Sequence, residues 1–349
     1  MKEYRCLQCR KTNLPRRDFL RVGSLSFLGL GTSQYLQHQG LQAAIGPSNM
    51  VGKAQSCILI FLEGGAPQMD TWDPKGNTGF KAIGTNVAGI QISELFPRVA
   101  GHMDKISIIR SMHTEETNHP QGTIESLTGH RPSPTMKFPS FGSIVAKEMG
   151  ARNNMPPVTA VPTPYENDFY NYEEAFKGAF IGAEYDAMLL PDPTEEDYVV
   201  PDLSLPKSIS AEAIKDRKTL LSIVDRHYRE KEKIAEFAKM DAFRTQALEM
   251  ILSPEVKKAF DFSNESEETK DLYGRNRVGQ SILMARRLVE SGCRFVTAAG
   301  YKHGQWDTHG NNDKRMLNDL APPLDQALSA LLVDLQERGL LESTVVLVM

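Results

Sequence analysis

The residues of this sequence that could do chemistry are aspartates and histidines that gather in three stretches of the chain. They are Asp70 and Asp73 in the first stretch, His113, Asn118 and His119 in the second, and His303, Asp307 and His309 in the third. Carboxylate oxygens and imidazole nitrogens are the ligands that a divalent ion such as zinc or manganese recruits. Any one of these side chains could instead cap a helix or satisfy a turn. The prediction of a metal site therefore rests on the whole set.

Each stretch follows an apolar segment that predicts a strand. Residues 56–62 (SCILIFL) form an unbroken apolar run that ends in Gly64-Gly65, which is typical of a buried parallel strand opening into a loop. Three further segments predict strands: residues 105–110 (KISIIR), 294–299 (RFVTAA) and 344–349 (TVVLVM). Open α/β sheets bind ligands beyond the carboxyl ends of their strands. We therefore expect the three stretches to meet at one edge of the sheet.

Periodic apolar residues predict helices between these strands. They cover residues 95–103, a segment from Pro120 to Gly129, residues 211–251, a helix that restarts after Ser253, residues 279–291 and residues 324–338. Strands alternating with helices predict an α/β fold, in which helices sandwich a mostly parallel sheet. Residues 151–207 have no clean period and predict an irregular excursion that could carry one short strand. Because nothing follows the fourth strand, we expect the fold to be incomplete at the C-terminus.

His119 stands at the predicted start of the helix that begins near Pro120. Unpaired amide groups and the helix dipole favour an anion at such a position. His119 could therefore ligate a metal or hold a phosphate or sulfate, and its neighbour Asn118 could be the helix cap. Trp72 and Trp306, each next to an aspartate, could wall a pocket, although core packing under the loops is the favoured interpretation.

Composition narrows the classes of partner. A formal net charge of −4 gives no basic surface for a nucleic-acid backbone, so we expect no nucleic-acid partner. Cys6 and Cys9 form a C-x-x-C pair with no further ligands nearby, and their role stays open. Cys57 and Cys293 each open an apolar run and fit buried small hydrophobic side chains, with a disulfide between them as the alternative.

The N-terminal segment predicts export. Residues 15–36 contain two adjacent arginines, then Phe-Leu and a short, weakly apolar run, which matches a twin-arginine signal. The alternative is a basic amphipathic helix on a cytosolic protein. We divide the chain into a signal and linker, residues 1–50, and one domain, residues 51–349. The expected location is the periplasm or the exterior, or the membrane if the signal stays uncleaved, with no other transmembrane span.

Several segments resemble the bacterial family called domain of unknown function 1501. They are GGAPQMDTWDPK at residues 64–75, SPEVKKAFDFSNE at 253–265, DLYGRNRVGQSILMARRLVESGCRFVT at 271–297 and QWDTHGNN at 305–312. That family in turn resembles the alkaline phosphatase and sulfatase superfamily. Here the matching segments are IESLTGHRP at residues 124–132 and the helix and strand of residues 324–349.

The resemblance implies roles for individual residues. Asp307 and His309 are similar to an acidic and a histidine ligand of one superfamily metal site, although the superfamily histidine usually stands four residues after the acid, where this chain has Asn311. His119 occupies the place of the nucleophile, which is normally Ser, Thr or Cys. Either Glu63 or Asp70 would replace the usual aspartate after the first strand. The Asp-His pair expected after the fourth strand would lie beyond the last residue.

These observations lead to one main hypothesis and two alternatives. The main hypothesis is an exported metal-dependent hydrolase of phosphate or sulfate esters, acting on a small molecule or a polysaccharide. Its metal would be zinc, manganese or calcium. The assigned roles are His119 as catalytic residue, Asp307, His309, Asp70 and His303 as metal ligands, and Asn118 and His113 as anion-binding residues. The alternatives are a non-catalytic exported binding protein and a partner subunit for an enzyme encoded beside it.

Overall fold

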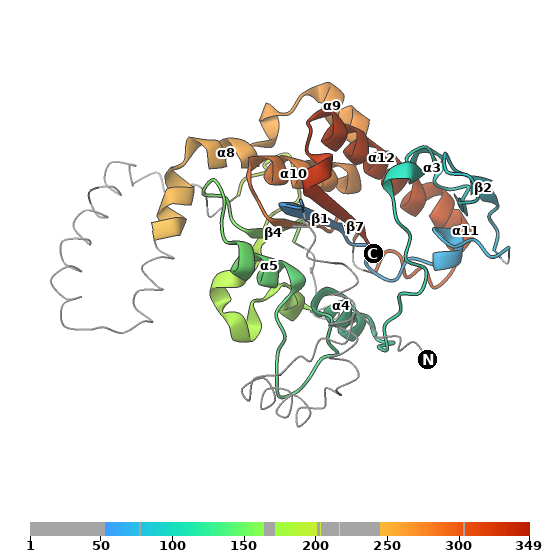
Figure 1. The fold of residues 1–349 in the computed structure, drawn as a ribbon, viewed down its shortest axis with the longest axis horizontal. Helices are drawn as coiled ribbons and strands as arrows, with labels where there is room; N and C mark the ends of the chain where they lie inside the picture. The colour runs from blue at the N-terminus through green and yellow to red at the C-terminus, as the bar shows by residue number, and fades with distance from the viewer. Residues whose placement is uncertain are drawn as a thin grey trace, which may run out of the picture. The chain divides into compact units, whose positions relative to one another are not determined.

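A parallel sheet of five strands forms the centre of the structure (Figure 1). The computed structural model describes residues 53–76, 78–163, 172–200, 203, 216, 245–302 and 304–349. Across the sheet the order is β5 (Met188–Leu189), β4 (Val158–Val161), β6 (Phe295–Ala298), β1 (Ser56–Ile60) and β7 (Thr344–Val348). All pairings in this sheet are parallel, so the carboxyl ends of its strands share one edge. The prediction of an α/β fold with a mostly parallel sheet is confirmed.

The position of β1 inside the sheet, between β6 and β7, explains why its sequence is apolar without interruption. The strand pairs with β6 on one side, where Cys57 faces Phe295, and with β7 on the other. Successive side chains of a strand point to opposite faces. Ile58 and Ile60 enter the core on one face of the sheet, whereas Leu59 enters a second core on the other face. A strand buried on both faces cannot alternate with polar residues.

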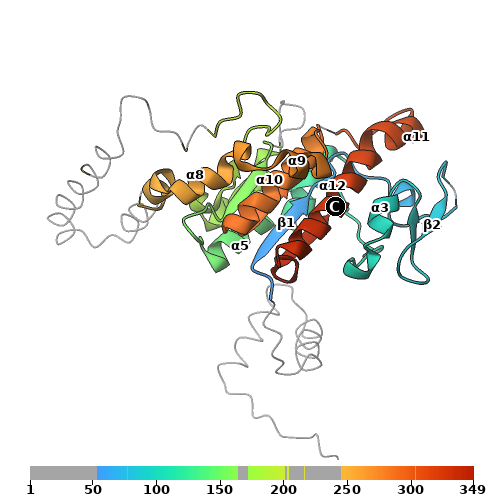
Figure 2. The same cartoon turned by 90° about the horizontal axis from the view of Figure 1, so that it is seen from above.

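Helices cover both faces of the sheet (Figure 2). The described helices include α3 (Pro97–Ala100), α4 (His119–Thr128), α5 (Phe141–Met149), α8 (Pro254–Phe260), α9 (Glu267–Tyr273), α10 (Arg277–Ser291), α11 (Asn312–Arg315) and α12 (Ala321–Glu337). Short turns are η1 (Gln68–Asp70), η2 (Met103–Lys105), η4 (Glu173–Phe176), η5 (Ala179–Ile181), η6 (Ala183–Tyr185), η8 (Phe262–Asn264), a π-helical turn η9 (Met316–Leu320) and η10 (Leu341–Ser343). Residues of α10 and α12 fill the core with Ile58, and residues of α4 and α5 fill the core with Leu59.

Local sequence sets where several of these helices begin. The side chains of Ser140, Ser253, Ser266 and Asn276 each accept a hydrogen bond from the backbone N–H three residues later, which satisfies one unpaired amide of the first turn. Gly129 ends α4 with a φ of 74°, a left-handed conformation that glycine adopts at low cost.

A smaller layer, made of a two-stranded sheet and α3, lies beside the amino-terminal part of α12. Strands β2 (Ala82–Gly84) and β3 (Gln91–Ser93) form an antiparallel pair that leads into α3. Asp325 of α12 accepts hydrogen bonds from the N–H groups of Arg98 at 3.1 Å and Val99 at 2.9 Å. This carboxylate therefore caps the start of α3 from another helix and joins the two layers.

A buried charge network holds α10 and α12 to the turn η8. Arg286, which is 1% exposed, contacts Glu265 at 2.6 Å, Glu290 at 2.7 Å and Asp334 at 2.8 Å. The remaining members are Arg287, 2.9 Å from Glu265, and Arg338, which contacts Glu290 and Asp334. Burial opposes ionisation of Glu265, but the guanidinium groups of Arg286 and Arg287 outweigh it and hold its pKa below the ordinary value. Its three arginines and three carboxylates leave this network with no net charge.

Three secondary-structure predictions were wrong. Residues 105–110 do not form a strand. Ile106 and Ile108 pack against the core with half-buried side chains, while residues 106–109 form no ladder with any described strand. The helix expected at residues 95–103 shortens to α3, followed by η2. The irregular excursion at residues 151–207 contains two strands of the main sheet, β4 and β5, where one at most was expected.

Other predictions are confirmed or lie outside the described residues. The strands β1, β6 and β7 and the helices α4, α8, α10 and α12 lie where the sequence predicts them. Most of the helix predicted at residues 211–251 lies outside the described residues. The described residues at its carboxyl end, 245–252, are helical. No helix in the described part of the chain is both long enough and apolar enough to cross a membrane.

Candidate metal centre at the carboxyl edge of the sheet

Three candidate side chains from two distant stretches of sequence converge in the structure. The Nε2 atom of His119 lies 2.8 Å from Oδ2 of Asp307, and the Nε2 atom of His309 contacts the same oxygen. Together the two imidazoles and the carboxylate offer three ligand atoms within 4.8 Å of one another. The side chains are 37% exposed at His119, 24% at Asp307 and 82% at His309, so solvent reaches the group from the His309 side.

The helix α4 places His119 at its first position. Asn118 precedes it in an extended conformation, and Pro120 follows in the first turn, where its fixed φ fits the helix and its missing N–H is not needed. The side chain of Asn118 is exposed and makes no capping bond, although its backbone carbonyl accepts from Gly122. Asn118 is thus the helix cap through its backbone carbonyl alone, and its side chain plays no part in the cap.

The loop after β6 carries Asp307 and is anchored by Trp306. The indole is 2% exposed and packs edge-to-face on Tyr301 with ring centroids 5.1 Å apart. Its backbone N–H donates to the carbonyl of Glu63, in the loop after β1, at 3.0 Å. Both tryptophans next to aspartates pack in or against the main core, as the favoured interpretation predicts.

Gly64 allows the loops after β1 and β6 to touch. It has a φ of +109°, and a Cβ built at this position would lie 2.5 Å from the backbone nitrogen of Asp307 and 2.8 Å from the carbonyl carbon of Gly304. No side chain fits there without moving the loop backbone. Gly64, the first residue of the Gly-Gly pair predicted to end the strand, therefore allows close approach to the backbone of a candidate ligand.

Asp70 lies in η1, in the loop after β1, and is joined to the Asp307 loop by hydrogen bonds. Its Oδ2 accepts from Nδ2 of Asn312 at 2.8 Å, and Oδ1 of Asn312 accepts from the Thr308 hydroxyl at 3.1 Å. Asp70 is only 6% exposed and does not belong to the group of three converging donors. Asp73, by contrast, is held by Arg110 at 3.2 Å and Lys75 at 2.8 Å.

The remaining predicted site residues lie elsewhere. His113 is exposed, with Nδ1 3.4 Å from the carbonyl of Ser111, and it is not one of the converging donors. His303 lies outside the described residues. The second stretch of candidates follows residues 106–109, which do not form a strand. His119 lies at the carboxyl edge of the sheet because it is the first residue of α4. Sequence reasoning missed Asn312, whose only signal was a polar side chain near the other loop candidates.

The donor set fits a transition-type divalent metal. Two imidazole nitrogens and one carboxylate are ligands of catalytic zinc, which binds three protein side chains and keeps a further position open. They also suit manganese, whereas calcium takes oxygen ligands and fits two imidazoles poorly. Among the metals expected from the sequence, the types of donor atom therefore suit zinc or manganese better than calcium.

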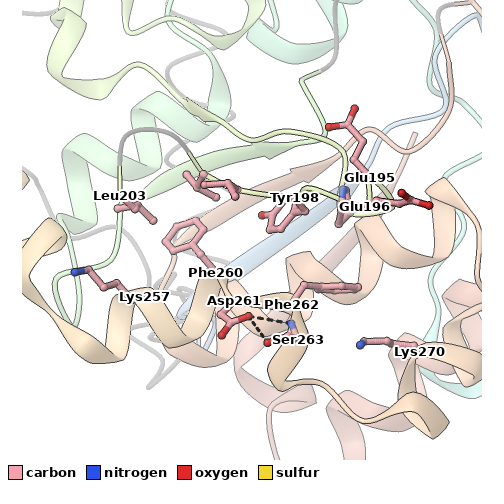
Figure 3. Close-up of a pocket in the computed structure, with 13 residues that line it drawn as sticks. Glu195, Glu196, Tyr198, Leu203, Lys257, Phe260, Asp261, Phe262, Ser263 and Lys270 are labelled. Carbon is pink, nitrogen blue, oxygen red and sulfur yellow. Dashed lines mark hydrogen bonds between the residues drawn. The ribbon is translucent and has the colours of Figure 1, made fainter. Parts of the chain in front are cut away.

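One hollow in the described part of the structure lies away from this group. A cavity of about 400 Å³ opens between residues 193–200, together with Leu203, and the helices α8 and α9 (Figure 3). Tyr198, Phe260 and Phe262 line it, and Nζ of Lys270 stands 5.5 Å from the Phe262 ring centroid. None of the candidate ligands lines this cavity, so the chemistry expected from the sequence is not located there.

Comparisons with known proteins give a family and no function. Neither a search of curated proteins nor a search of solved structures finds a match. The model of the family described as "Protein of unknown function (DUF1501)" matches residues 54–349, which include every described strand and helix and all three converging donors. The resemblance noted for the four sequence segments is thus confirmed over the whole described fold, and the chain belongs to the DUF1501 family of proteins of unknown function.

Proposed function

We propose that this protein is an exported, metal-dependent hydrolase of phosphate or sulfate esters. The observation that carries the proposal is the convergence of His119, Asp307 and His309 at the amino end of α4. Donors for a divalent ion and the positive end of a helix dipole then meet in one place. That combination suits an ester that carries an anionic phosphate or sulfate group. Export is proposed from the twin-arginine pattern of residues 15–36.

In this proposal each residue has a defined task. His119, Asp307 and His309 hold the ion, which when bound polarises the ester and lowers the pKa of a bound water. The contact between Nε2 of His119 and Asp307 supports a ligand role for that nitrogen. The first-turn N–H groups of α4 orient the phosphate or sulfate group. The superfamily likeness implied by the segments at residues 124–132 and 324–349 supports the same reaction class.

One observation favours a second candidate function, a non-catalytic metal-dependent binding protein or partner subunit. The His309 side chain is 82% exposed, so the described residues do not seal the group from water. A site open to solvent can bind an ion without the desolvated environment that strengthens catalytic electrostatics.

Metal analysis combined with turnover assays tests the proposal. We expect the purified protein to bind about one equivalent of zinc or manganese and to hydrolyse an aryl phosphate or an aryl sulfate. Asp307→Asn should abolish both properties. Asp319→Asn is a matched control, because Asp319 is an exposed carboxylate on the neighbouring turn η9 without a described partner. Metal bound without turnover of either ester would favour the binding protein, and no bound metal would refute the centre itself.

A further inference from the structure

The buried carboxylate of Asp70 has an unusual set of partners. It is 6% exposed, its Oδ2 accepts from Asn312 at 2.8 Å, and its Oδ1 has no partner among the described residues. No arginine or lysine in the described part of the chain pairs with it. A buried carboxylate without a cation is costly unless hydrogen bonds hold it. Its position therefore calls for a functional explanation, either as a ligand or as a support.

The amide of Asn312 is fixed in one orientation by its two partners. Its Nδ2 donates to Asp70, and its Oδ1 accepts from the hydroxyl of Thr308 at 3.1 Å. Thr308 stands between Asp307 and His309 in the sequence. Asp70, Asn312 and Thr308 are thus joined by consecutive hydrogen bonds. This path begins at the buried carboxylate of Asp70, in the loop after β1, and ends at the residue between the candidate ligands Asp307 and His309.

The backbone that this path supports is strained. His309 has a φ of 50° and Asn311 a φ of 55°, left-handed values that cost energy in residues other than glycine. Arg315 adds to the support by donating to the carbonyls of Gln305 at 2.8 Å and Thr308 at 3.3 Å. Without such restraints the largely exposed His309 ring could leave Asp307, because among the described residues the ring contacts only this member of its own loop.

We propose that Asp70 is a positioning residue that acts through Asn312 and Thr308, and that it is not itself a metal ligand. This inference rests on the proposed metal centre. In metal sites generally, hydrogen-bonded partners behind the ligands set their orientation, and losing such a partner weakens metal binding about 10- to 100-fold. The rival interpretation is that Oδ1 of Asp70 binds a second cation beside the three converging donors.

The substitution Asp70→Asn separates the two roles. The amide of asparagine keeps an oxygen that can accept from Nδ2 of Asn312, but it removes the charge that a cation would require. In zinc titrations we expect Asp70→Asn to stay within about threefold of the wild-type affinity at an unchanged stoichiometry. Asp70→Ala, Asn312→Ala and Thr308→Val should each weaken binding about 10- to 100-fold. Asn318→Ala, an exposed asparagine on η9 with no described partner, is the matched control for Asn312→Ala.

A metal-free measurement keeps this inference distinct from the proposed function. Ring ¹⁵N–¹H spectra of the histidines at one fixed pH report whether His119 and His309 still contact Asp307. We expect the signals to be retained in Asp70→Asn and altered in Asn312→Ala and Thr308→Val, with circular dichroism confirming that each variant is folded. Asp70→Asn binding zinc as poorly as Asp70→Ala, or losing one of two bound ions, would overturn the positioning role. Wild-type protein that binds no zinc would refute the proposed function, while the ring spectra would still decide whether Asp70 orders the loop.

Discussion

Two clusters of charged side chains in this protein are built on opposite principles. In the buried charge network every carboxylate faces at least one arginine, and Arg286 at its centre is 1% exposed. In the candidate metal centre a single carboxylate, Asp307, faces two imidazoles and no arginine or lysine among the described residues, and His309 is largely exposed. In the first cluster the positive and negative charges balance, whereas in the second the charge of Asp307 has no arginine or lysine partner among the described residues.

The difference indicates which cluster stabilises the fold and which one serves function. A matched buried network joins elements, because breaking one pair leaves an uncompensated charge inside the protein. Donors that converge without a cation contribute little to stability, and such groups are typical of ligand and catalytic sites. The comparison makes predictions that separate the two clusters by measurement.

The largest expected effect follows from breaking the buried network. Arg286→Met should lower the free energy of unfolding by about 3–5 kcal/mol, because it leaves Glu265 and Asp334 buried without their central partner. Urea denaturation followed by circular dichroism measures this change. Arg275→Met is the matched control, since Arg275 pairs with Glu267 and Asp271 on the exposed surface. A similar loss in both variants would show that the buried network has no special role.

A second effect should appear only at the metal centre. Zinc at a hundred times its dissociation constant should stabilise the wild type by about 2.7 kcal/mol, since it binds the folded state alone. In Asp307→Asn this gain should vanish, while the metal-free stability should change by less than about 1 kcal/mol. Thermal unfolding with and without zinc tests both parts. A large loss of metal-free stability in Asp307→Asn would mean that this cluster, too, is structural.

The dependence of stability on pH tests how much the ion pairs of Glu265 contribute to the buried network. The pKa of Glu265 is lowered in the folded state, because Arg286 and Arg287 outweigh the effect of burial. Such a carboxylate contributes stability above its ordinary pKa of 4.5, and this contribution is lost as the pH falls through the lower folded value. Glu265→Gln should therefore be less stable than the wild type at pH 7 and should lose less stability on acidification. Denaturation curves from pH 7 to pH 3 would show parallel losses if the ion pairs contributed nothing.

The smallest expected effect concerns the two cysteines at the amino end of the sheet, which are free thiols in the structure. Burial raises the pKa of Cys293 to about 11 and that of Cys57 to about 12. At pH 8 both should react slowly with a thiol reagent such as dithionitrobenzoate, because the thiolate is the reactive form. In a Cys6→Ser, Cys9→Ser variant we expect full reaction only after unfolding. Fast labelling of the folded protein would show that this end of the sheet opens readily.

Sequence patterns predicted much of the fold because they are local. The apolar run of β1, the serine cap of α8 and the glycine end of α4 each follow from residues within a few positions. The sequence allowed one short strand within residues 151–207 but did not locate it, because Val158–Val161 is only four residues long and lies in a region rich in proline. Residues 105–110 were assigned to a strand wrongly, since strand formation needs a neighbouring strand that local pattern cannot supply.

The sequence by itself determined the fold class, the types of the candidate metal-binding side chains and the two loops that carry Asp70 and Asp307. Only the tertiary structure decided which of these side chains meet. Asp307 and His119 are separated by 188 positions in the chain, and their contact depends on the strand order and on where α4 begins. Asp70 and His113 also have side chains that can bind a metal, yet neither is one of the converging donors. Asp70 is buried and bonded to Asn312, whereas His113 is exposed in a loop. Ligand geometry is a property of distances in space, and residue type and spacing constrain those distances only within a single element.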